Sequence, residues 1–314
     1  MKSHLGFSIG LLLGLAVLHG AAKDQNSERE LIQDNHFRSG FILWQPMPGQ
    51  HQRYGELKGF NSHSKPVWGL AQWNSKFPLF AASPVKTTDG GLVFSNAAKS
   101  VQLGLVATPT ADISLSANSS LEYGVKARQP GEPWAHLLVE QEFDPPAPLA
   151  KLHAAKLHVE AKLQQADNLH QNDYRPAVHA AQFQIFFIVQ NRDQQSPGYG
   201  DLLWFGVPIY DNRNRFPEAS MAQDFGGTAK FIFTPGAKIF TSECAHDGRW
   251  IALDKDLLPL MREALDAAWA SGFLPKSKKL EDYYISGMNM GWELPGTFNV
   301  AMQIRNLSLK LSEN

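Results

Sequence analysis

The chain has 314 residues, with 29 Lys and Arg against 30 Asp and Glu, which gives a formal net charge of −1. A near-neutral chain without a basic block lacks the positive surface that collects nucleic-acid phosphates, so we expect no nucleic-acid partner. The single cysteine, Cys244, excludes an internal disulfide. We expect it to be a small buried apolar residue, because neither Glu243 nor Ala245 would stabilise a thiolate.

The N-terminus has the pattern of a secretory signal peptide. Lys2 precedes an apolar run over 5–18, and the small residues Gly20, Ala21 and Ala22 follow it. A membrane-spanning helix needs about 20 apolar residues, so this run better fits a signal peptide, residues 1–22, cleaved after Ala22. We therefore predict a secreted or periplasmic protein with no membrane attachment after cleavage. An uncleaved N-terminal anchor is the alternative.

The segment 23–40 is polar and charged with little periodicity, which is typical of a linker or a short helix before the folded body. The remainder, 41–314, fits one elaborated domain. A domain boundary near the Pro145, Pro146 and Pro148 cluster is an alternative, although a stiff surface loop is the commoner meaning of such a cluster.

From Phe41 onward the dominant pattern is alternation with a period of two, which places one set of side chains in a core. Turn sequences such as Asp89-Gly90-Gly91 and Pro295-Gly296 separate the alternating segments. We predict an all-β, antiparallel two-sheet β-sandwich of the jelly-roll type. Its predicted strands are 41–45, 68–73, 91–95, 101–105, 113–117, 121–127, 136–143, 157–164, 182–190, 202–210, 230–234, 283–290 and 298–311.

The predicted strand 136–143 carries the strongest candidate for catalysis. Alternation places His136, Glu140 and Glu142 on one face. Residues two apart on a strand are roughly 6.5–7 Å apart, a spacing at which two carboxylates can divide into acid and nucleophile or base. We name these three residues as candidate catalytic residues. The alternative is a solvated strand face without chemistry.

The run Glu140-Gln-Glu-Phe-Asp144 resembles the acidic strand of laminarinase-type jelly-roll glucanases, in which carboxylates alternate along one strand. The resemblance implies hydrolysis of a glycosidic bond by the Glu140 and Glu142 pair. The chain departs from that pattern at Glu142, at Asp144, where a Glu is expected, and in the prolines that follow.

A second candidate site lies at 204–215. If Leu203 and its alternate neighbours point inward, Trp204 and Tyr210 point outward, and Asp211 and Arg213 follow in a loop. Aromatic faces beside charged and amide groups are what a sugar site needs, so we predict that these four residues bind a ligand. The alternative is that Trp204 fills a core.

One amphipathic helix is predicted near 254–271, with apolar residues at three- and four-residue spacing and Gly272 just beyond its end. We expect it to be peripheral, packed on the outside of the sandwich.

The C-terminal segment reads as two strands around the Pro295-Gly296 turn. It resembles the closing hairpin of jelly-roll carbohydrate-binding modules, in which an acidic residue before the turn and an Asn near the end of the last strand recur. Glu293 and Asn306 occupy these places. The resemblance implies that Glu293 contacts the ligand, and a turn cap or an ion pair is the alternative for it.

No spacing of ligands predicts a transition-metal site, and we expect no cofactor, although loop oxygens of Asp211, Asn212 and Asn214 would suit a structural Ca²⁺. The first functional hypothesis is an exported sandwich protein that binds an oligosaccharide or polysaccharide. The second is a glycoside hydrolase or polysaccharide lyase of the same fold, with a carboxylate pair. The third is a non-catalytic structural protein of the envelope. Nothing in the sequence indicates the oligomeric state.

Overall fold

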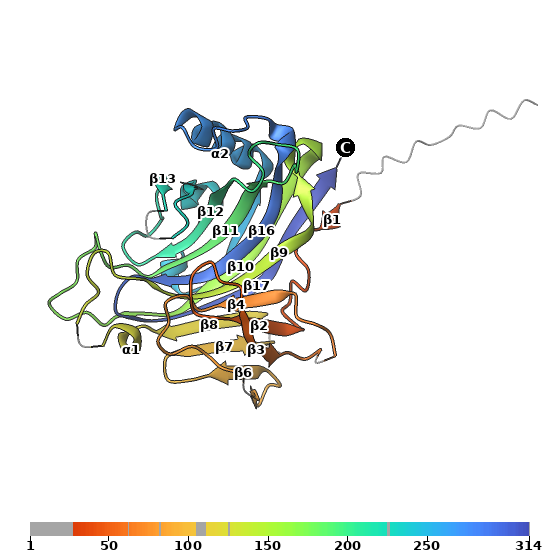
Figure 1. The fold of residues 1–314 in the computed structure, drawn as a ribbon. Helices are drawn as coiled ribbons and strands as arrows, with labels where there is room; N and C mark the ends of the chain where they lie inside the picture. Colours follow the sequence, from red (N-terminus) through yellow and green to blue (C-terminus); the bar gives the residue numbers. More distant parts are fainter. Residues whose placement is uncertain are drawn as a thin grey trace, which may run out of the picture.

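The computed structural model describes residues 28–313 except 62, 82, 105–110, 125 and 225–226. The predicted signal peptide lies outside these residues. The described chain forms two β-sheets packed face to face, with a helix at one end (Figure 1). This is the mostly β, two-sheet jelly-roll architecture that the alternating pattern predicts.

The first sheet has eight strands, and β1 (Arg29–Glu30) pairs with its strand β17. In spatial order, its other strands are β15 (Ile251–Asp256), β10 (Leu152–Asn168), β17 (Phe298–Glu313), β8 (Ile113–Asn118), β7 (Lys99–Leu103), β6 (Leu92–Ser95) and β5 (Val85–Lys86).

The second sheet has nine strands and is antiparallel except for two parallel pairs, β12 with β14 and β2 with β4. Its spatial order is β13 (Ser220–Gln223), β14 (Phe231–Thr234), β12 (Leu202–Asp211), β11 (Gln182–Asn191), β16 (Tyr283–Leu294), β9 (Ala135–Pro148), β4 (Trp68–Ala71), β2 (Gly40–Trp44) and β3 (Arg53–Lys58). Short 3-10 helices cover Leu149–Lys151, Ala237–Ile239, Ala245–Asp247 and Leu280–Asp282.

The core lies between the sheets and takes every second residue of the central strands. On β11, Phe183 and its alternate neighbours are buried, while Gln182 and Gln184 on the opposite face are half-buried. The ring of Phe183 meets that of Trp292 on β16 edge to face, with centroids 5.1 Å apart. Burial of such aromatic side chains supplies a large share of the hydrophobic stabilisation.

The N-terminal segment differs from its predicted role as a linker or short helix. Within its described part, Leu31, Ile32 and Phe37 belong to the core, and β1 pairs with β17. Gln33 also exchanges two hydrogen bonds with the side chain of Gln141, at 2.8 and 2.9 Å. The segment packs on the sandwich instead of linking to it, because burial of these three apolar side chains is favourable.

The predicted strand at 121–127 is wrong. The chain instead forms the short helix α1 (Ser120–Tyr123). Asn118 Oδ1 accepts hydrogen bonds from the backbone N–H and the hydroxyl of Ser120, at 3.1 and 2.5 Å, and this local bonding turns the chain where alternation predicted extension.

The helix α2 (Leu258–Ala270) is shorter than the predicted 254–271, because β15 extends to Asp256. Asp256 Oδ1 accepts the Leu258 N–H at 3.1 Å, and Pro259 follows in the first turn, where its missing N–H costs nothing. The helix contacts β10 of one sheet and β12 and β14 of the other, so it covers one end of the sandwich (Figure 1).

Candidate functional site

The outer face of the nine-stranded sheet carries the candidate catalytic residues together. On β9, His136, Glu140 and Glu142 point away from the core, while Leu137 and Val139 are fully buried. The predicted shared face of these three residues is therefore present in the structure. Their proposed roles are not fixed by this placement.

Strand register brings residues from β16 and β11 beside them. Glu293 on β16 lies opposite His136, and Asn289 lies opposite Glu140. Gln184 on β11 reaches across to donate a hydrogen bond from Nε2 to Glu293 Oε2 at 3.2 Å. We call the group His136, Glu140, Glu142, Gln184, Asn289 and Glu293 the outer-face cluster.

His136 and Glu293 form the first half of the cluster, with Nε2 and Oε1 3.8 Å apart and side chains only 11% and 18% exposed. Burial lowers the pKa of His136 to about 4. Burial, with the negative charge of Asp224 as the next contribution, raises the pKa of Glu293 to about 7. A neutral imidazole therefore faces a carboxyl group that holds its proton up to about neutral pH.

The orientation of the His136 ring follows from its hydrogen bonds. The carbonyl oxygen of Trp134 can only accept a hydrogen bond, so at 2.9 Å the nitrogen that donates to it, His136 Nδ1, carries the ring proton. In the neutral ring, Nε2 is then the unprotonated nitrogen, and it faces Glu293. The ring lies between two indoles, edge-on to Trp73 at 5.6 Å and stacked on Trp134 at 6.4 Å.

Glu140 forms the second half of the cluster. His51, from the loop after β2, lies with Nε2 3.2 Å from Glu140 Oε1. The hydrogen bond to Glu140 raises the pKa of His51, against the effect of burial, so proton uptake by His51 strengthens this ion pair. Glu142, two residues further along β9, is exposed.

Polar atoms without partners gather around this cluster. Among the described residues, four buried side-chain nitrogen or oxygen atoms have no hydrogen-bond partner, and three of them lie here: Trp44 Nε1, Trp73 Nε1 and Asn289 Oδ1. An unpaired buried polar atom costs about 1–3 kcal/mol, and such atoms are rare in folded proteins. Their concentration around one set of carboxylates makes this face the candidate site.

Trp44 owes its position to Gly69. Gly69 on β4 lies between Ile42 on β2 and Glu140 on β9 in the register. A Cβ atom at Gly69 would lie 2.0 Å from Trp44 Nε1, so the indole rests directly on the glycine. Only glycine leaves the space for this contact.

The other side of the cluster is aromatic and apolar. Trp204 on β12 is half-buried on the outer face, with Ile188 opposite it on β11. Its Nε1 donates to Thr228 Oγ1 at 3.0 Å, and Thr228 in turn donates to Asp224 Oδ2 at 2.7 Å. The predicted outward placement of Trp204 is confirmed, while its role in binding stays a prediction.

Tyr210 does not share that placement, and the prediction that it faces outward is wrong. The side chain is 3% exposed, packs on Trp292 and His246, and burial raises its pKa to about 12. A β-bulge between Phe183 and Gln184 in the pairing with β12 is the cause. The extra residue in β12 reverses the alternation and turns Tyr210 into the core.

Asp211 and Arg213 are bound to each other. Arg213 donates from Nε and Nη2 to the two carboxylate oxygens of Asp211, at 2.8 and 2.5 Å, and Asp211 is 4% exposed. Asn212 Oδ1 accepts the Ala181 N–H at 2.7 Å. Asp211 is the last residue of β12 rather than a loop residue, and the side-chain oxygens of Asp211 and Asn212, which were expected to suit Ca²⁺, are engaged by protein donors. In the described part of the chain, no group of three His, Cys, Asp or Glu is arranged to hold a metal ion.

Five residues of this face were not predicted: Trp44, His51, Gln184, Asn289 and Asp224. Alternation on β2, β11 and β16 could have placed Trp44, Gln184 and Asn289 on the outer face. His51 and Asp224 have no such signal, because they lie in loops. Cys244 is buried, as expected, and its Sγ lies 2.9 Å from the Arg215 carbonyl oxygen.

No protein-family model matches the chain, and no curated protein matches it. Solved structures with a similar course of the chain include endoglucanase Cel12A from Rhodothermus marinus, at 10% identity and a TM-score of 0.38, over 71% of this chain and 92% of that one. A family 12 xyloglucanase from Bacillus licheniformis is 9% identical, with a TM-score of 0.41, over 74% and 99%. The family 11 xylanase from Neocallimastix patriciarum is 9% identical, with a TM-score of 0.38, over 71% and 91%.

At such identities and TM-scores, the likeness carries no conclusion about what this chain does. None of the described helices is both long and apolar enough to cross a bilayer.

Proposed function

We propose that this protein binds a carbohydrate on the outer face of its nine-stranded sheet. The observation that carries the proposal is the set of three unpartnered buried polar atoms, Trp44 Nε1, Trp73 Nε1 and Asn289 Oδ1, around Glu140 and His136. These atoms are covered in the unliganded protein, so a ligand reaches them only by drawing the covering side chains aside. Sugar hydroxyls both donate and accept, so such a ligand can supply the partners that the indole donors and the amide acceptor lack.

The remaining groups of the face suit the same ligand. Indole rings offer flat apolar surfaces to the C–H face of a sugar ring, and Trp204 and the half-exposed Trp134 flank the cluster from two sides. Carboxylates and amides such as Glu140 and Gln184 take up hydroxyl groups. Few polar groups fixed among aromatic ones are typical of sites that recognise an uncharged, hydroxyl-rich molecule.

Binding is tested with a glycan array followed by calorimetric titration of the best glycan. We expect Trp204→Ala to weaken binding about 10-fold or more, because a stacked aromatic ring contributes on the order of 1 kcal/mol or more. Trp250→Ala is the matched control, since Trp250 is a half-buried indole outside the outer face, stacked against Arg305. We propose that no metal takes part, so dialysis against EDTA should leave the affinity unchanged.

Equal affinities for Trp204→Ala and the wild type would contradict the proposed site. No binding to any glycan on the array would favour the third hypothesis, a structural protein of the envelope.

A substitution at Gly69 tests the Trp44 side of the face without removing an aromatic ring. In Gly69→Ala the new methyl group would overlap Trp44 Nε1, so the indole must leave its place over β4. We expect glycan affinity to fall about 10-fold, which corresponds to about 1.4 kcal/mol.

The control for this substitution is Gly236→Ala, where φ is −65° and the nearest atom is 3.3 Å from the added Cβ. Thermal unfolding of both variants shows whether the fold is retained. A Gly69→Ala protein that binds like the wild type would exclude Trp44 from the site.

Hydrolysis of the bound glycan is the second candidate, and the raised pKa of Glu293 favours it. A glycosidase needs one protonated and one ionised carboxyl group. Glu293, at about 7, can hold the proton, and the charge of Asp224 is close enough to act on it. Glu140 and Glu142 remain the predicted pair on β9, whereas Glu140 and Glu293 are offset by four residues, or about 13 Å, along the strands.

Assays for reducing ends and for unsaturated products separate the two candidates. Hydrolysis by Glu293 requires that Glu293→Gln abolish turnover while glycan affinity is retained. Turnover that survives in Glu293→Gln but is lost in Glu140→Gln would assign the chemistry to the β9 pair.

We also propose export, on the strength of residues 1–22. N-terminal sequencing of the protein recovered outside the cytoplasm should begin at Lys23, and recovery of an intact Met1 terminus would contradict cleavage.

A further inference from the structure

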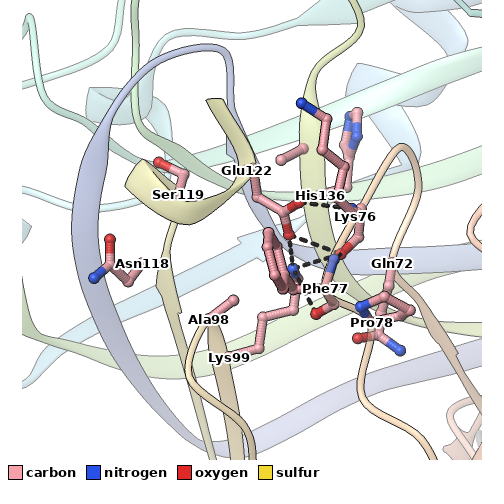
Figure 2. A network of polar contacts seen from close by, with 12 residues as sticks. Gln72, Lys76, Phe77, Pro78, Ala98, Lys99, Asn118, Ser119, Glu122 and His136 are labelled. Carbon is pink, nitrogen blue, oxygen red and sulfur yellow. Dashed lines mark hydrogen bonds and ion pairs between the residues drawn. The ribbon is translucent and has the colours of Figure 1, made fainter. Parts of the chain in front are cut away.

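A buried ion pair lies beneath the His136 end of the outer-face cluster. Lys99 on β7 and Glu122 on α1 form it, with side chains 2% and 3% exposed. Figure 2 shows the two side chains pointing toward each other, with further contacts to the segment that follows β4. A buried pair often contributes little net stability compared with apolar residues of the same size, so its position calls for another explanation.

The pair holds the segment 72–79. Lys99 Nζ donates to Ser75 Oγ at 2.7 Å and to the Phe77 carbonyl at 3.4 Å. Glu122 accepts from Ser75 Oγ at 2.7 Å and from the Lys76 N–H at 2.6 Å. Lys99 on the sheet and Glu122 on the helix therefore hold the middle of segment 72–79 in place through these hydrogen bonds.

The same segment fixes the surroundings of His136. The carbonyl of Trp73 accepts the backbone N–H of His136 at 3.1 Å. Asn74 Nδ2 donates to the Trp134 carbonyl at 3.0 Å, and the same oxygen accepts the hydrogen bond from His136 Nδ1 at 2.9 Å. The Trp134 carbonyl oxygen thus links segment 72–79 to the His136 imidazole, because it accepts a hydrogen bond from each.

From these contacts we propose that Lys99 and Glu122 are positioning residues for His136. The ion pair holds segment 72–79, the segment holds the Trp134 carbonyl through Asn74, and that carbonyl keeps the His136 proton on Nδ1. Nε2 is then left unprotonated toward Glu293. The tautomer itself is a property of the fold, while its importance for the ligand rests on the proposed function.

The tautomer is measured directly by long-range ¹H–¹⁵N spectra of the histidine rings, with the His136 signals assigned by comparison with His136→Phe. In the wild type we expect a protonated Nδ1 and an unprotonated Nε2. In the double variant Lys99→Met with Glu122→Leu, which replaces the charges with apolar groups, we expect both tautomers to be populated.

A second variant tests the same link without disturbing the buried pair. Asn74→Gly removes the amide that holds the Trp134 carbonyl, and glycine accepts the φ of +59° at this position. We expect the same mixture of tautomers. The control is Ser196→Ala, which removes a hydroxyl from the separate buried network around Asp282.

The spectra test the positioning role of Lys99 and Glu122, and the glycan titration tests the use of His136 in the proposed function. A His136 ring that stays in the Nδ1–H form in both variants would overturn the positioning role. A change of tautomer with a roughly 10-fold loss of glycan affinity supports both proposals. A change of tautomer with unchanged affinity supports the positioning role and contradicts the part of the proposed function that uses His136.

Discussion

Replacing Lys99 alone with methionine is expected to lower the free energy of unfolding by about 3–5 kcal/mol, because it leaves one partner of a buried ion pair without the other. Glu122 would keep the Ser75 hydroxyl and the Lys76 N–H as donors, but no positive charge. In the wild type, burial tends to raise the pKa of Glu122, and the hydrogen bond and charge of Lys99 outweigh it and hold that pKa below its usual value.

Denaturant unfolding at pH 7 measures this loss. The matched comparison is Lys99→Met with Glu122→Leu, which should recover most of the stability because no charge stays buried alone. If Lys99→Met alone were within about 1 kcal/mol of the wild type, water must reach Glu122, and the pair could not be the rigid anchor described above.

The second large effect is a pH-dependent gain of stability in Glu293→Gln. In the folded protein the pKa of Glu293 is raised from 4.5 to about 7, so the folded state binds the proton more tightly than the unfolded state. Its contribution to stability is fully present below about pH 4.5 and is lost as the pH rises through 7. At pH 8 the wild type then carries a buried charge that glutamine lacks.

We therefore expect the two proteins to have similar stability near pH 4.5, and Glu293→Gln to be more stable by on the order of 3 kcal/mol at pH 8. Unfolding titrations across this range provide the measurement. The lowered pKa of His136 acts in the opposite direction, since stability from its neutral form is lost as the pH falls below about 6.5, but it is present in both proteins. A difference that is constant with pH would show that the folded and unfolded states bind this proton equally, and hence that folding does not raise the pKa of Glu293.

Much of the fold follows from local alternation. The strands β9 and β11 were predictable because their buried residues recur with a period of two over nine or more positions. In β17 the same period holds over 298–304 and, in the opposite phase, over 307–311. The exceptions arise where a side-chain hydrogen bond or an extra residue in a strand interrupts that pattern. Asn118 turns the chain into α1, and the bulge in β12 reverses the faces just before Tyr210.

The candidate site was predictable only along single strands. His136, Glu140 and Glu142 share a face because they are two and four residues apart, and this needs no partner strand. That Glu293 lies opposite His136, or that Gly69 makes room for Trp44, depends on pairings between distant segments. Lys99 and Glu122 also look like ordinary surface charges in the sequence, and only the packing of α1 on β7 buries them.

The order of the strands also bears on how the chain comes to be folded. The two last strands are central: β17 lies between β10 and β8, and β16 between β11 and β9. Neither sheet can complete its central pairings until β16 and β17 have been synthesised. If the chain is exported as proposed above, this late completion would suit passage through a secretory channel, which a protein crosses unfolded.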